Sequence, residues 1–88
     1  MDRAELSKQK GEIAAKLETA LKEKFNLESV NVAHGIAWND DGALDFAFII
    51  QVSAQDTQAI SDFARATVKE LAPTSKPRIS VGPIPRAL

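Results

Sequence analysis

The fold is decided by residues 30–52, which read VNVAHGIAW-NDDGA-LDFAFIIQV. On both sides of NDDGA, large apolar residues alternate with small or polar ones, which is the period of a half-buried strand. The connection at residues 39–43 suits a type I turn with Gly42 in the left-handed position, followed by a G1 bulge. We therefore predict a β-hairpin in this region.

The turn and the hydrophobic pattern predict the same register for this hairpin. If Asn39 faces Ala43, then Trp38 pairs with Leu44, and every large apolar side chain of both strands falls on one face. A shift by one residue would move the apolar residues of the second strand to the opposite face from those of the first. Two independent signals thus agree on how the strands pair.

A helix is predicted before the hairpin, from Arg3 to Phe25. Its apolar residues recur at spacings of seven and four, as one helical face requires. Asn26 is suited to the left-handed position that ends a helix. Because Gly11 weakens the first turns, we expect residues 1–5 to fray.

A second helix and a third strand are predicted after the hairpin. Ser53, with Asp56 three residues later, resembles a capping box, and an apolar stripe follows over residues 60–71. Residues 78–82 then alternate as a short strand, which Pro83 is expected to end.

The expected fold class is therefore α+β: a two-layer sandwich of α-β-β-α-β order, in which two helices cover one face of a three-stranded mixed sheet. We expect one domain over residues 1–88, with residues 83–88 as an extended tail. The same order of elements resembles that of the cytoplasmic domains of cation-diffusion transporters, of BON domains and of the ring-building domains of secretion systems. This resemblance in element order implies oligomerisation or attachment.

The composition argues against several classes of function. With 11 basic and 12 acidic residues, the formal charge is −1, so there is no positive field to attract nucleic acid. The longest strongly apolar run, residues 46–50, is too short to span a bilayer, and we expect a cytoplasmic protein without a membrane segment. The absence of cysteine excludes thiolate chemistry, and the four dispersed glycines form no phosphate-binding loop. We expect no cofactor, no metal site and no catalytic residue, which favours a binding protein over an enzyme.

The face of the sheet away from the helices is the main candidate site. Its predicted residues are small, with Ile49 as the one large apolar side chain, whereas a face meant only for water usually carries Thr, Lys, Glu or Arg. The alternative is a solvated face that happens to be small. The candidate interface residues are Ala33, Gly35, Ala37, Ala47, Ile49, Arg78 and Ser80.

His34 and Trp38 are the candidates for binding a ligand. His34 has the phase of the helix-covered face, where a lone histidine is expected to be a hydrogen-bonded core residue. Trp38 ends its strand beside the turn, where its indole is expected to cap the edge of the core. A proton-transfer, metal or ligand-anchoring role is the alternative. Asp45 is expected on the opposite face, and Asp40 and Asp41 in the turn, which argues against a shared site.

Three hypotheses on function follow. The first is a non-catalytic interaction module, a homo-oligomer or a partner of another protein, that uses the open sheet face and the C-terminal tail. The second is a small-ligand or metal-responsive domain centred on His34 and Trp38. The third is an enzyme whose site is completed between subunits.

Overall fold

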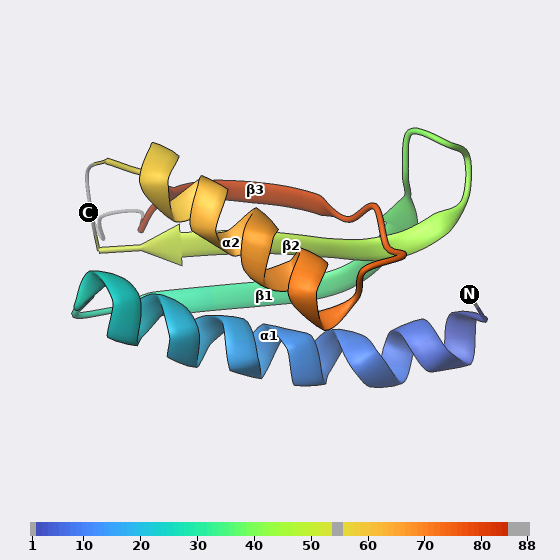
Figure 1. The fold of residues 1–88 in the computed structure, drawn as a ribbon, viewed down its shortest axis with the longest axis horizontal. Helices are drawn as coiled ribbons and strands as arrows, with labels where there is room; N and C mark the ends of the chain where they lie inside the picture. The colour runs from blue at the N-terminus through green and yellow to red at the C-terminus, as the bar shows by residue number, and fades with distance from the viewer. Residues whose placement is uncertain (1, 54–55, 85–88) are drawn as a thin grey trace.

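The computed structural model describes residues 2–53 and 56–84. Its elements follow the predicted α-β-β-α-β order along the chain (Figure 1). They are α1 (Arg3–Phe25), β1 (Val30–Trp38), β2 (Leu44–Val52), α2 (Gln58–Leu71) and β3 (Arg78–Pro83).

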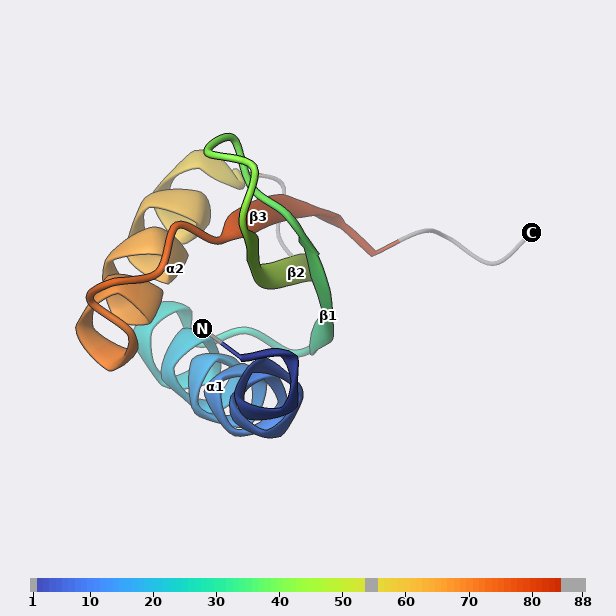
Figure 2. The same cartoon turned by 90° about the vertical axis from the view of Figure 1, so that its right-hand side faces the viewer.

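The three strands form one mixed sheet of order β1-β2-β3. β1 pairs with β2 antiparallel, and β3 pairs with β2 parallel, so β2 is central and both of its neighbours are edge strands. Both helices lie on the same side of the sheet and leave the other side uncovered (Figure 2). The predicted fold class is confirmed.

The register of the hairpin is the predicted one. Trp38 pairs with Leu44 at the turn, and Val30 pairs with Val52 at the open end. The backbone N–H of Asn39 donates to the carbonyl of Ala43 over 2.8 Å. Within the turn, Gly42 has a φ of 77°, the left-handed conformation that the G1 bulge requires.

The core lies between the helices and the sheet and is centred on β2. Phe46 and Phe48 are almost completely buried, and their stacked rings have centroids 5.9 Å apart. Because β2 has a strand on each side and helices beneath it, its inward side chains are the best covered in the sheet. From the helices, the most deeply buried side chains are Leu6, Leu17, Leu21, Ile60, Ala64 and Val68.

α1 has the predicted bounds, Arg3 and Phe25, and its first turn, where fraying was expected, is helical. The Asp2 carboxylate accepts a hydrogen bond from the Ala4 N–H at the first turn, over 3.2 Å. At the other end Asn26 adopts the left-handed conformation with φ of 51°. The chain can therefore turn from α1 directly into β1.

The predicted start of the second helix was wrong. α2 begins at Gln58, whose N–H donates to the Asp56 carboxylate over 3.1 Å. Ser53 instead continues the hairpin register, since its N–H donates to the Ser29 carbonyl. Its hydroxyl accepts from the Ser29 N–H over 2.8 Å, so the side chain closes the open end of the hairpin rather than capping a helix.

β3 extends one residue further than predicted. Pro83 still lies opposite Val52, and the following Ile84 N–H donates to the Val52 carbonyl over 3.1 Å. Along β3, alternate residues direct their backbone N–H and C=O groups toward β2. Pro83 is one of the residues that face away from β2, so its missing N–H does not interrupt the parallel pairing. The rest of the expected tail, residues 85–88, lies outside the described residues.

The turn conformation can be tested with a pair of glycine variants. Gly42→Ala should destabilise the fold by about 1 kcal/mol, because a β-carbon is strained in the left-handed region. Gly35→Ala is the control, since a β-carbon there meets nothing within 4 Å and its φ is not left-handed. Urea unfolding of both variants measures the difference, and a Gly42→Ala protein as stable as the control would contradict the turn assignment.

Candidate interaction face

The uncovered side of the sheet has a small-residue centre around one large apolar side chain. Ile49 of β2 lies between Ala33 of β1 and Ser80 of β3 in the paired registers. Its residue surface is 58% exposed. The structure thus places the predicted interface residues Ala33, Ile49 and Ser80 side by side. We call this side of the sheet the open face, with the residues Asn31, Ala33, Gly35, Ala37, Ala47, Ile49, Gln51, Arg78 and Ser80.

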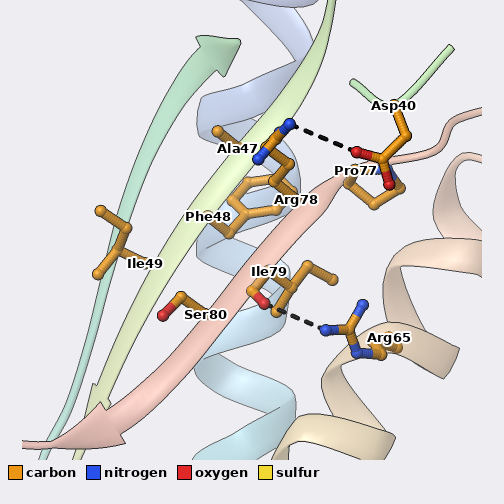
Figure 3. A pocket seen from close by; sticks show the side chains of 9 residues that line it. All are labelled: Asp40, Ala47, Phe48, Ile49, Arg65, Pro77, Arg78, Ile79 and Ser80. Carbon is orange, nitrogen blue, oxygen red and sulfur yellow. Dashed lines mark hydrogen bonds and ion pairs between the residues drawn. The ribbon is translucent and has the colours of Figure 1, made fainter. Parts of the chain in front are cut away.

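Arg78 crosses the open face toward the hairpin turn. Its Nε donates to the Trp38 carbonyl over 2.8 Å, and its Nη2 lies 3.4 Å from the Asp40 carboxylate. In the register Arg78 is the β3 neighbour of Ala47, whose methyl group leaves room for the guanidinium to reach from β3 to the end of β1 (Figure 3). The Arg78 guanidinium and the Asp40 carboxylate therefore form one polar border of the apolar centre.

A hollow lies beside Ile49 at the start of β3. It is lined by Asp40, Ala47, Phe48, Ile49, Arg65, Pro77, Arg78, Ile79 and Ser80. The guanidinium of Arg65 reaches from α2 to donate to the Ile79 carbonyl over 3.2 Å (Figure 3). The hollow is thus bordered by one arginine from β3 and one from α2.

The opposite border of the open face is also polar. Asn31 of β1 and Gln51 of β2 are paired in the register, and the Asn31 amide donates to the Gln51 side-chain oxygen over 3.4 Å. The apolar centre is therefore enclosed along the strands by a polar row at each end, an arrangement found in many protein interfaces.

Asp45 was expected to be exposed on the open face, but it is buried. The residue is only 8% exposed. Its carboxylate accepts hydrogen bonds from the backbone N–H groups of Phe46 and Lys76, each over 2.7 Å, and from the Asn39 amide over 3.2 Å. The loop before β3 covers Asp45, which ties that loop to the hairpin turn.

An exposed ion pair lies next to this anchor. Lys76 donates to the carboxylate of Asp41, and this hydrogen bond, together with the negative charge, raises the pKa of Lys76 above its ordinary value. Such a pair stabilises the fold below the unfolded-state pKa of lysine, and the contribution is lost as the pH rises through the raised value. Because both groups are exposed to water, the pair adds little to stability.

The core position predicted for His34 was wrong, because the residue is exposed. Its imidazole does face α1, but at the point where a β-carbon would lie 3.8 Å from the imidazole Cε1 the helix carries Gly11, which offers no side chain to cover the ring. Lys10 approaches the imidazole instead, with Nζ 2.8 Å from Nδ1. Since an ammonium can only donate, Nδ1 acts as the acceptor in this contact.

Trp38 does not cap the core as predicted, because it is 62% exposed. It is the last residue of an edge strand, so it has a paired neighbour, Leu44, on one side only. His34 and Trp38 are four residues apart on a strand, which separates them by about 13 Å. The structure does not bring these two ligand candidates together.

Within residues 2–53 and 56–84, no group of three His, Cys, Asp or Glu side chains is placed to hold a metal ion. No helix in the same part of the chain combines the length and apolar character needed to cross a membrane. Comparison with known protein families, curated proteins and solved structures finds no match for this chain. The residues themselves are therefore the guide to its function.

The anchoring role of Asp45 predicts a clear loss of stability on substitution. Asp45→Asn should lower the free energy of unfolding by about 1–3 kcal/mol, because the amide cannot accept all three hydrogen bonds and loses the charge. Asp40→Asn is the matched control, since the Asp40 side chain is fully exposed. Urea unfolding compares the two, and equal stability of both variants would refute the anchor.

Proposed function

We propose that this protein is a non-catalytic interaction module whose open face packs against an apolar protein surface, with a second copy of the chain as the partner. The observation that carries the proposal is Ile49, which is 58% exposed at the centre of a patch of small residues. Burial of such a side chain on association removes apolar surface from water and stabilises the complex.

The shape of the open face supports close approach of a second surface. A β-carbon placed on Gly35 would meet nothing within 4 Å, and the neighbouring Ala33 and Ala47 carry only methyl groups. A partner can therefore approach the backbone of β1 closely at Gly35. The polar rows at Arg78 and at Asn31 would form the rim around this contact.

A second copy of the chain is the partner we favour, because the association then requires no other protein. The open face is apolar at its centre, so two copies meeting face to face bury one Ile49 against the small residues of the other. A small-ligand site near His34 and Trp38 is the second candidate, but it has less support because the two side chains belong to separate parts of the β1 edge.

The proposal predicts that association depends on Ile49. The wild-type chain of 9.5 kDa should show a mass that rises with concentration in sedimentation or light scattering. Ile49→Lys should lower the association constant at least tenfold, because the charge would be buried without a partner. A wild type that is monomeric at high micromolar concentration would contradict the self-association proposal.

Leu71→Lys is the matched control for Ile49→Lys. Leu71 is an exposed apolar residue at the end of α2, 40% exposed and away from the open face. The same change in charge and hydrophobicity should leave the mass unchanged there. If both variants dissociate equally, the effect comes from net charge, and the open face is not the contact.

A further inference from the structure

The outer edge of β1 is a second surface, distinct from the open face. Two hydrogen bonds show which backbone groups on the β1 side of the hairpin face β2. The Asn39 N–H donates to the Ala43 carbonyl, and the Ser29 carbonyl accepts from the Ser53 N–H. Backbone groups alternate in direction along a strand, so the odd-numbered residues of β1 bond to β2. The N–H and C=O groups of Val32, His34 and Ile36 therefore point away from the sheet.

This edge lacks the features that usually prevent strands from pairing with another chain. None of the nine residues of β1 is Lys, Arg, Asp, Glu or Pro, and the strand has no bulge between Val30 and Trp38. Natural proteins normally protect such an edge with charges, prolines, bulges or a covering segment. An unprotected edge of this length is a template for strand addition.

The edge at β3 is different, because it is protected. β3 has six residues, and its Ile79 carbonyl accepts from the Arg65 guanidinium. Pro77 precedes the strand and Pro83 ends it, and neither has an N–H to donate. The β3 edge is thus protected by two prolines and an arginine, whereas on β1, among the residues that the structure describes, a side chain occupies a carbonyl only at the last residue, Trp38, which accepts from Arg78.

The side chains along β1 leave its edge accessible. Ala33 and His34 are both exposed. α1 packs beneath β1 rather than over the open face (Figure 2). Where α1 comes close to His34 it presents Gly11, and the helix side chain that reaches this strand is Lys10, whose ammonium contacts the imidazole rather than the β1 backbone.

We propose that β1 pairs antiparallel with β1 of a second copy, which joins two three-stranded sheets into one six-stranded sheet. The register that uses all nine residues places His34 opposite His34 of the second copy. Val32 then lies opposite Ile36 of the second copy, and Val30 opposite Trp38. In this register the outward backbone groups of Val32, His34 and Ile36 each donate and accept one hydrogen bond.

A second copy fits this edge better than an unrelated peptide for two reasons. A charged strand would meet its own charge across the two-fold axis, and β1 has no Lys, Arg, Asp or Glu. Trp38, which is 62% exposed in the single chain, would be covered on the side where it lacks a strand neighbour. The pairing also makes the open faces of the two copies continuous through Ala33 and Gly35.

This inference deepens the proposed function and rests on it, because both require the chain to associate with itself. The two contacts use separate surfaces, the β1 edge and the open face. His34→Pro removes an outward N–H and leaves the odd-numbered bonds to β2 intact, as is tolerated on edge strands. His34→Thr is the matched control, because it keeps the N–H and suits a strand. We expect His34→Pro to halve the oligomer mass and His34→Thr to leave it unchanged.

The masses of wild type, His34→Pro and Ile49→Lys together separate the two surfaces. If both surfaces associate, the wild type contains four or more copies, and His34→Pro and Ile49→Lys each form dimers. If the edge alone associates, His34→Pro is monomeric and Ile49→Lys stays dimeric, which refutes the proposed function only. If the face alone associates, Ile49→Lys is monomeric and His34→Pro stays dimeric, which overturns the edge pairing only. A wild type that is always monomeric overturns both.

Hydrogen exchange of the wild-type protein tests the pairing without any substitution. The amides of Val32, His34 and Ile36 face solvent in the single chain, whereas those of Ala33 and Gly35 bond to β2 in either state. Edge pairing predicts that protection of the first set rises at least tenfold between low and high micromolar concentration, with little change in the second. An unchanged first set across that range would overturn the inference, even if His34→Pro fails to fold.

Discussion

The hydrogen bond from the Asn39 N–H to the Ala43 carbonyl determines much of this structure, because it closes the turn at one particular register. Side chains alternate between faces with a period of two, so the register decides which side of the hairpin each of them occupies. With Asn39 opposite Ala43, the apolar residues of β1 and β2 fall on one side and the small residues on the other. The two helices need an apolar surface to pack on, and only one side offers it.

The position of β2 in the centre of the sheet explains the unequal burial of the two hairpin strands. Phe46, Phe48 and Ile50 are buried because β3 pairs on their far side and both helices lie beneath. His34 and Ile36 have the same phase on β1 but lie at an edge, and they are more exposed. Burial in this small domain is therefore decided by distance from the edge as much as by the face on which a residue lies.

The open face and the β1 edge adjoin along β1, where Ala33 and Gly35 lie on the open face and the backbone groups of Val32, His34 and Ile36 form the edge. The loop before β3 is held beside the hairpin turn by the buried Asp45 carboxylate, which accepts a hydrogen bond from the Lys76 N–H. That contact keeps β3 alongside β2, so Ser80 lies next to Ile49 and Arg78 can reach the end of β1. The proposed contacts thus depend on one charged group that is itself not available to a partner.

The order of elements, the hairpin register, the left-handed residues Asn26 and Gly42 and the division into two faces could all be predicted from the sequence, because each depends on local turn chemistry or on periodicity. The exposure of His34 and Trp38 and the burial of Asp45 could not. They depend on which strand is central, on where a helix presents glycine, and on which distant loop supplies a covering N–H. Periodicity assigns a residue to a face, whereas only the packing of segments remote in sequence decides how far that face is covered.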